Sequence, residues 1–286
     1  MTAQIIDGKI VAKTLREKIK EKVKAYQEKG IVPGLAVILV GKDPASQIYV
    51  RKKAEACQEC GIKSEVFNLD ETTAEKDVLA LIESLNQRRD IHGILVQLPL
   101  PGHLNAKAVI EAINPAKDVD GLHPLNMGKL LAGNPALIPC TPYGCMKLIE
   151  STAYAIRGKN AVVIGRSDLV GKPIAALLLK ENATVTICHS HTQNLAEITG
   201  KADILVVAVG KPHFITGEMI KPGALVLDVG INRLSTGKIT GDVDFSVAAE
   251  IAGWITPVPG GVGPMTITML LENTLEATYE QENILH

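Results

Sequence analysis

The stretch NAVVIGRSDLVGKPIAALLLKENATVTICHS, residues 160–190, decides the fold. It opens with an apolar run, Ala161–Ile164, of the kind expected for a strand buried on both faces. A glycine-containing turn, an apolar helix and a second strand follow. Two further runs, ADILVVAVG and GALVLDVG, repeat the buried-strand pattern. The order strand, glycine turn, helix, strand predicts a Rossmann-like, doubly wound α/β domain that binds a dinucleotide.

The turn in VVIGRSDLVGKP departs from the usual G-x-G-x-x-G fingerprint. Gly165 and Gly171 are six residues apart, and Ser167 replaces the middle glycine. The N-terminus of the following helix still offers backbone N–H groups and a positive dipole end to a phosphate, and Ser167 can donate a further hydrogen bond. The alternative is a tight turn with a structural role alone.

The end of the next strand indicates which dinucleotide is bound. Sites selective for NAD usually place an Asp or Glu there to hold the ribose 2′-hydroxyl. This chain has CHSHT at residues 188–192, without a carboxylate, and Arg166 could neutralise a 2′-phosphate. NADP is therefore favoured over NAD, the alternative being an Arg166 that only faces solvent.

The first half of the chain predicts a second parallel α/β layer. Apolar or alternating strands are expected at 35–41, 63–68 and 92–100, separated by helices, and this alternation is typical of parallel sheets. The loops that follow are rich in Pro, Gly and Asn. Helices are expected at 8–29, 44–60, 73–89, 142–152 and 266–280.

The helix SQIYVRKKAEACQEC contains three consecutive cations, which a helical wheel separates. Arg51 and Lys52 fall on the polar side, together with Ile48, which fits poorly there. Lys53 falls in the middle of the apolar side, with Tyr49 one turn before it. Lys53 either extends its amine to water while its stem packs, or presents a partly desolvated amine for proton transfer.

Two other polar residues are expected near the buried face of this helix. Gln97 closes the strand HGILVQLPL, and Asp120 lies in the loop KDVDG. Each could simply fix a loop by hydrogen bonds. Together with Lys53 and Tyr49 they supply an amide, a carboxylate, an amine and a phenol, a set suited to a polar heterocycle and a step that uses water.

Length and composition limit the function classes. The 286 residues are enough for two domains, and a composition with 46% hydrophobic and 21% charged residues is typical of a soluble globular protein. The net charge of −1 argues against nucleic acid or an anionic membrane as partner. No apolar run reaches the roughly 18 residues that span a bilayer, and the N-terminus lacks the apolar core of a signal peptide.

Five cysteines, an odd number, favour a reduced, cytoplasmic protein. Cys57 and Cys60 form a C-x-x-C late in a helix, where core packing is favoured over redox chemistry. His189 and His191 alternate near a strand end, but no further ligands stand out, so no metal site is expected.

Nearly the whole chain resembles the bifunctional methylenetetrahydrofolate dehydrogenase/methenyltetrahydrofolate cyclohydrolases. The matching motifs are VGKDPASQIYVRKK, GILVQLPLP, KDVDGLHPLNMGKL, PCTPYG, VVIGRSDLVGKP, TVTICHSHT, DVGIN, GDVD and TPVPGGVGPMT. The resemblance implies an NADP-dependent enzyme of one-carbon folate metabolism that oxidises 5,10-methylenetetrahydrofolate and hydrolyses the methenyl product to 10-formyltetrahydrofolate. Its partners would be tetrahydrofolate derivatives, with polyglutamylated forms left open, and a second copy joined through the cofactor domains.

The resemblance also implies a domain organisation. Residues 1–145, completed by a C-terminal helix at about 267–286, would form the folate-binding catalytic domain. Residues 146–266 would form the Rossmann-like NADP-binding domain, with a cleft between the two.

Residue roles follow from the matching motifs. Lys53 resembles the lysine that assists water attack, Gln97 the residue that tunes it, Tyr49 the tyrosine stacked on the pterin, and Asp120 the carboxylate that hydrogen-bonds the pterin. A fully cationic lysine cannot accept a proton, so the apolar surroundings of Lys53 matter. The other implied contacts are Pro259, Gly260 and Gly261 on the folate side, and Gly165, Arg166, Ser167, Gly171, Ser190 and, beside the nicotinamide, Ile231 on the cofactor side.

Three alternatives remain at this point. The chain could be a dehydrogenase that barely uses the hydrolytic step, although Lys53, Gln97 and Asp120 are all present. It could be a non-catalytic dinucleotide-sensing dimer, which would not need those pterin-side residues. A shikimate-type dehydrogenase has a similar domain order, but its own Lys/Asp pair is not found here.

Overall fold

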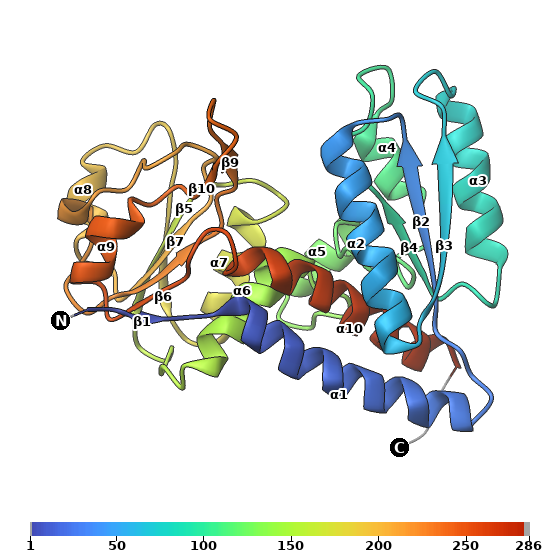
Figure 1. Cartoon of the computed structure of the whole chain (residues 1–286), viewed down its shortest axis with the longest axis horizontal. Helices are drawn as coiled ribbons and strands as arrows, with labels where there is room; N and C mark the ends of the chain where they lie inside the picture. Colours follow the sequence, from blue (N-terminus) through green and yellow to red (C-terminus); the bar gives the residue numbers. More distant parts are fainter. Residues whose placement is uncertain (1, 283–286) are drawn as a thin grey trace. The chain divides into compact units, whose positions relative to one another are not determined.

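The computed structural model describes residues 2–282 and shows two compact units (Figure 1). One unit combines the N-terminal residues up to Lys13 with Thr141–Thr266. The other combines Thr14–Cys140 with the chain from Ile267 onward. We call them the six-stranded unit and the three-stranded unit after their main sheets. The predicted two-part α/β organisation is confirmed.

The six-stranded unit is built on a sheet with the order β1-β11-β8-β7-β5-β6, in which every neighbouring pair is parallel. The central strands are continuous apolar runs because both faces of a parallel sheet are covered. This confirms the Rossmann-like prediction. The strands are β1 (Gln4–Ile5), β5 (Asn160–Ile164), β6 (Thr184–Cys188), β7 (Ile204–Val207), β8 (Leu225–Asp228) and β11 (Trp254–Ile255).

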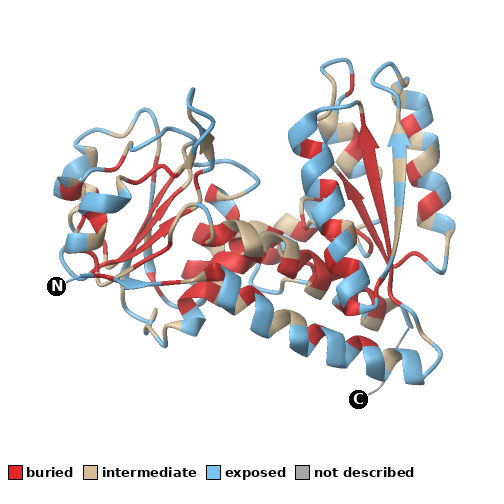
Figure 2. Ribbon diagram, in the orientation of Figure 1, coloured by how far each residue is buried: buried red, intermediate tan, exposed pale blue. Residues whose placement is uncertain are grey.

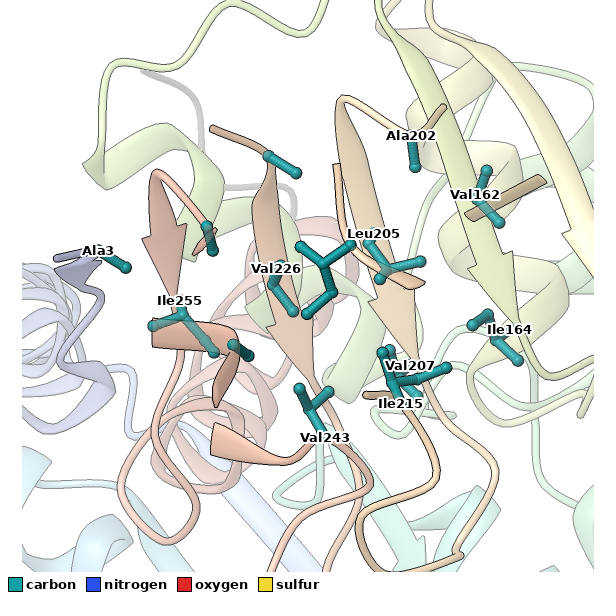
Figure 3. Packing of buried hydrophobic residues seen from close by; sticks show 14 of the residues in the cluster. Ala3, Val162, Ile164, Ala202, Leu205, Val207, Ile215, Val226, Val243 and Ile255 are labelled. Carbon is teal, nitrogen blue, oxygen red and sulfur yellow. The ribbon is translucent and has the colours of Figure 1, made fainter. Parts of the chain in front are cut away.

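Short elements surround this sheet, and side chains from its strands form its core. Val162, Leu205 and Val226 come from three adjacent strands and share one buried cluster with Ile255 and Ala248 (Figure 3). The surrounding elements are α6 (Cys140–Ser151), α7 (Gly171–Lys180), α8 (Leu195–Thr199), η1 (Gly217–Met219), β9 (Asn232–Arg233), β10 (Ile239–Thr240) and α9 (Phe245–Ile251).

The three-stranded unit has a parallel sheet with the order β3-β2-β4. The central strand, β2, is buried along its whole length, whereas the residues of the edge strand β3 are exposed or intermediate in burial (Figure 2). The strands are β2 (Gly34–Val40), β3 (Lys63–Leu69) and β4 (Gly93–Val96). The helices are α1 (Gly8–Glu28, which begins in the other unit), α2 (Pro44–Cys60), α3 (Glu75–Gln87), α4 (Ala106–Glu111), α5 (Pro124–Leu131) and α10 (Val262–Glu282, which also begins there).

The two faces of this smaller sheet pack against different helices. Ala36, Ile38 and Val40 form a cluster with Val78 and Ile82 of α3 and with further apolar residues of β4 and α4. Because side chains alternate along a strand, the intervening residues of β2 face the other way. Helix α2 packs against β2 and β3, so the residues on its buried side are held against the sheet.

The helix boundaries agree well with the expected start and stop signals. Asp43 caps α2 by accepting a hydrogen bond from the Ser46 N–H, Pro44 opens the helix, and Gly61 ends it in the left-handed conformation. Helix α10 starts one turn earlier than predicted, at Val262. Strands β1 and β11 are absent from the prediction because each has only two residues, too few for a periodic pattern.

Candidate active site

The buried amine of Lys53 defines the candidate site of the three-stranded unit. Lys53 is only 8% exposed, and its Nζ donates a 2.9 Å hydrogen bond to Oε1 of Gln97. The Gln97 amide is held in turn, since its Nε2 donates to the Leu98 carbonyl at 2.6 Å. The side chain is therefore packed and hydrogen-bonded inside the unit, which excludes the alternative of an amine that simply extends into water.

The wheel of α2 is correct for most positions and wrong for one. Ile48 is exposed, as predicted, and the buried side contains Val50 and Lys53. Tyr49 was predicted on the buried side, but its ring is 38% exposed. Tyr49 lies between the buried Ala56 and Cys60 on the wheel, but it is near the N-terminal end of α2, and a wheel does not show which part of the helix length the neighbouring elements cover.

Asp120 lies beside the end of β4, in the loop KDVDG. The Ile94 N–H donates to the Lys117 carbonyl at 2.7 Å, and Ile94 forms a parallel bridge with Asp118. Asp120 follows in a turn, in which the Gly121 N–H donates to the Asp118 carbonyl at 3.0 Å, and the charges of Asp120 and Lys53 both act on the same buried thiol, that of Cys140. The structure thus brings Lys53, Gln97 and Asp120 close together.

Cys140 lies among these groups and was not assigned a role from the sequence. Burial, and next the charge of the Asp120 carboxylate, raise the pKa of the Cys140 thiol well above its ordinary value, while the charge of Lys53 acts in the opposite direction. Its Sγ lies 3.3 Å from the Val119 carbonyl, to which the protonated thiol can donate. The thiol is therefore a buried neighbour of Asp120 and Lys53 and is not a nucleophile at neutral pH.

In the six-stranded unit, the two fingerprint glycines allow a close approach of backbone segments. Gly165 has φ +118°, and a Cβ there would lie 2.3 Å from the Ala208 carbonyl oxygen. A Cβ on Gly171 would lie 2.2 Å from the Gly165 carbonyl oxygen. No other residue fits either position, so the turn and the N-terminus of α7 are pressed together at the carboxyl end of β5.

The expected 2′-phosphate contacts lie at one edge of the sheet. Ile164 pairs with Cys188, so Arg166 and Ser190 each follow the paired residues by two positions. Both are exposed, as is Ser167, whose hydroxyl oxygen accepts from the Val170 N–H at 3.1 Å. That hydroxyl keeps its own proton to donate to a ligand. An exposed cation and two hydroxyls near a helix N-terminus suit a phosphate.

A buried carboxylate that the sequence analysis missed organises the neighbouring loops. Asp242 is fully buried and accepts four hydrogen bonds, from the backbone N–H groups of Val209, Gly210 and Lys211 and from the Asn232 side chain, at 2.7–2.9 Å. These donors follow β7 and β8. The GDVD motif contained Asp242, but nothing in its spacing indicates which loops fold back onto it.

Ile231 sits in one of the loops that Asp242 fixes. It is 52% exposed, and it lies between Asn232, which is bonded to Asp242, and Gly230, where a Cβ would be 2.2 Å from the Asp242 carboxyl. The exposed apolar side chain is thus displayed on a rigid backbone, as contact with a flat ring would require.

The segment expected on the folate side packs against the start of α1. Gly260 has φ +109°, and a Cβ on Gly8 would lie 1.8 Å from the Gly261 carbonyl oxygen. Pro259 is exposed. These residues lie in the six-stranded unit immediately before α10 begins.

Residues 2–282 contain neither a candidate metal site nor a candidate membrane-spanning helix. In residues 2–282 no group of three or more His, Cys, Asp or Glu side chains is arranged to hold a metal ion. No helix in that range is long and apolar enough to cross a bilayer. The cysteines are free and buried, and burial raises the pKa of Cys57 to about 12 and that of Cys60 to about 11, so this C-x-x-C packs in the core.

The chain is similar to proteins of known family along nearly its whole length. Two family models match: the tetrahydrofolate dehydrogenase/cyclohydrolase catalytic domain over residues 6–120, and its NAD(P)-binding domain over residues 139–282. A curated relative from Moorella thermoacetica, named bifunctional protein FolD, is 58% identical over 97% of this chain and 99% of its own length.

Solved structures of the same family have nearly the same fold as this chain. The bifunctional enzyme FolD from Campylobacter jejuni is 49% identical with a TM-score of 0.96, covering 97% of this chain and 99% of that one. The FolD of Trypanosoma brucei, solved with NADP cofactor and an inhibitor, is 41% identical with a TM-score of 0.95, covering 99% of this chain and 100% of that one. The resemblance stated from the sequence motifs is confirmed: the chain belongs to the tetrahydrofolate dehydrogenase/cyclohydrolase family.

Proposed function

We propose that this protein oxidises 5,10-methylenetetrahydrofolate with NADP and hydrolyses the resulting 5,10-methenyl compound to 10-formyltetrahydrofolate. The observation that carries the proposal is the hydrogen bond, 2.9 Å long and partly buried, between the buried Lys53 and Gln97, close to Asp120. A dehydrogenase without the hydrolytic step, or a dinucleotide sensor, would have no use for a buried amine held by an amide. Membership in a family of bifunctional enzymes supports the same conclusion.

The hydrolytic step suits the groups of the three-stranded unit. The methenyl cation is electrophilic at its bridging carbon, and water adds there once a positioned group takes its proton. We assign that group to the Lys53 amine, oriented by Gln97. Asp120 anchors the pterin through hydrogen bonds, and Tyr49, exposed one helical turn before Lys53, stacks on the ring. Pro259, Gly260 and Gly261 shape the folate side.

The oxidative step needs alignment more than acid–base chemistry. A folate nitrogen beside the methylene carbon drives hydride onto the nicotinamide, so the protein supplies orientation. NADP supplies the hydride acceptor. We assign its pyrophosphate to the turn from Gly165 to Gly171, its 2′-phosphate to Arg166, Ser167 and Ser190, and its nicotinamide contact to Ile231. The six-stranded unit is thus the proposed cofactor domain and the three-stranded unit the proposed folate domain.

Two further assignments concern assembly and location. The protein is proposed to be a homodimer joined through the cofactor domains, because β6 forms an open sheet edge with Thr184, Thr186 and Ile187 exposed. Sedimentation of the wild-type chain and of Ile187→Lys tests this, with a shift to monomer expected for the variant. The free thiols fit the reducing cytoplasm, where we place the enzyme.

The decisive experiment is an absorbance assay with methylenetetrahydrofolate. We expect methenyl formation that is faster with NADP than with NAD, followed by decay of the methenyl absorbance to 10-formyltetrahydrofolate. Absence of methenyl formation with either cofactor would refute the oxidative step. A methenyl product that decays no faster than in buffer would refute the hydrolytic step.

A further inference from the structure

One buried amide in the C-terminal helix reaches two loops that lie far away in the sequence. Asn273 of α10 is 2% exposed, and its Nδ2 donates to the Val119 carbonyl at 2.8 Å and to the Ile138 carbonyl at 2.7 Å. The same nitrogen lies 3.6 Å from Sγ of Cys140. All four residues belong to the three-stranded unit.

The Asn273 amide lies where the loop of Val119 and Gly121 approaches the loop of Ile138 and Pro139. Gly121 has φ +73°, and a Cβ there would lie 2.5 Å from both the Ile138 carbonyl carbon and the Pro139 nitrogen. Val119 and Ile138 thus present their carbonyl groups to the same buried point, and Asn273 satisfies both. Loss of the amide would leave Val119 with only the weak thiol donor of Cys140 and would remove the side-chain donor of Ile138, a cost in free energy that favours separation of the loops.

Asp120 lies in the sequence between Val119 and Gly121, and the contacts with Asn273 and with the loop of Ile138 fix both neighbours. On one side is Val119, whose carbonyl accepts from both Asn273 and Cys140. On the other is Gly121, pressed against the loop of Ile138. The direction of the Asp120 carboxylate therefore depends on the backbone on both sides of it, in addition to its own side-chain interaction with Cys140.

We propose that Asn273 is a positioning residue for substrate recognition: its amide locks the loop that aims the Asp120 carboxylate at the pterin. The inference rests on the proposed function, in which Asp120 anchors the pterin. It predicts a residue with no contact to the reacting atoms whose loss weakens folate binding and leaves the cofactor side unchanged.

The same helix offers a matched control for a purely structural role. Thr278 is also buried in α10, but its hydroxyl bonds back to the Thr274 carbonyl within the helix and reaches no loop of the site. Thr278→Val therefore removes a buried polar group of α10 without releasing Val119 or Ile138.

The experiment measures KM for methylenetetrahydrofolate and for NADP in wild type, Asn273→Leu, Asn273→Ser and Thr278→Val, with thermal melting of each. We expect Asn273→Leu to raise the folate KM roughly tenfold, the size of one lost hydrogen bond, with the NADP KM within about twofold of wild type. Asn273→Ser keeps one hydrogen-bond donor, so its folate KM should lie between those of wild type and Asn273→Leu. Thr278→Val should leave the folate KM unchanged.

A double-mutant cycle with Asp120→Asn separates positioning from general damage. If Asn273 acts through Asp120, the effect of Asn273→Leu on the folate KM shrinks to about twofold or less in the Asp120→Asn background. An undiminished effect there, equal changes in both KM values, or loss of folding in both Asn273 variants would overturn the proposal. The wild-type arm tests the proposed function separately, and Asp120→Asn alone tests the assigned role of that carboxylate.

Discussion

The two candidate sites of this molecule are built in opposite ways. In the three-stranded unit the decisive amine, Lys53, is buried and held by another side chain, Gln97. In the six-stranded unit Arg166, Ser167 and Ser190 are exposed, and their positions are set by backbone packing at the glycines of the turn. The buried carboxylate of Asp242 holds the loops after β7 and β8.

The difference fits the two roles proposed for these sites. A proton-transfer group must be held in one geometry at the reacting carbon, which requires packing and a hydrogen-bond partner. A phosphate is a large, charged, solvated group that binds well to exposed cations and backbone N–H groups on a rigid turn. Substitutions at the two sites should therefore have different effects. A change at Lys53 should slow the hydrolytic step, whereas a change at Arg166 should weaken NADP binding.

The largest expected effect is on hydrolysis in Lys53→Met. The methionine keeps the packed stem of the side chain but has no amine to accept a proton, so we expect methenyl hydrolysis to fall by roughly 10²–10⁴-fold. NADP binding, measured by fluorescence titration, should stay at the wild-type level. Lys52→Met is the matched control, since Lys52 is the exposed neighbour in the same helix, and it should hydrolyse normally. Undiminished hydrolysis in Lys53→Met would remove the assigned role.

The next effect concerns stability and pH in the six-stranded unit. Burial, only partly offset by backbone hydrogen bonds, raises the pKa of Asp228 from an ordinary value of 3.8 to about 6, with the Asp242 carboxylate adding to the rise. The unfolded chain therefore loses this proton at lower pH than the folded chain. The stability contributed by the protonated form is complete below about pH 4 and is lost as pH rises to about 6.

Denaturant unfolding of wild type and Asp228→Asn at pH 4 to 7 measures this contribution. The free energy of unfolding of wild type, relative to the variant, should fall by about 2 kcal/mol over that range. A difference that stays constant across the range would show that Asp228 does not titrate there. Protein concentration and salt are kept fixed so that other carboxylates contribute equally to both chains.

A smaller effect is expected for Arg166→Ala. Loss of the exposed guanidinium should raise KM for NADP by roughly 10–100-fold, the size of a charge-assisted hydrogen bond, and change KM for NAD by about twofold or less. Lys180→Ala, at the far end of α7, is the control and should change neither. Equal effects on both cofactors would contradict the 2′-phosphate assignment.

Much of the fold follows from local pattern. The strands β2 and β5 are continuous apolar runs, and α2 is bounded by Asp43, Pro44 and Gly61, so periodicity and caps were enough to predict them. Strands β1 and β11 have two residues each and form only because β8 offers an edge for β11, and β11 in turn pairs with β1. No local pattern could have predicted them.

The site residues likewise include some that local sequence pattern predicts and some that it does not. Lys53 could be predicted because a cation in the middle of an apolar helix face is visible in the sequence. Asn273 and Asp242 could not, because their importance lies in hydrogen bonds to loops up to 154 residues away along the chain. An Asn in a helix or an Asp in a loop has many structural uses, and only the folded contacts distinguish them.

The central claim is that methenyl hydrolysis depends on Lys53 in the three-stranded unit and that NADP affinity depends on Arg166 in the six-stranded unit, and one measurement tests it most directly. Lys53→Met and Arg166→Ala are each assayed with methylenetetrahydrofolate at limiting NADP, recording methenyl formation and decay in the same sample. The account predicts that Lys53→Met forms methenyltetrahydrofolate and lets it accumulate, whereas Arg166→Ala forms it slowly but hydrolyses added methenyltetrahydrofolate at the wild-type rate. Variants that slow both steps in equal proportion would contradict it.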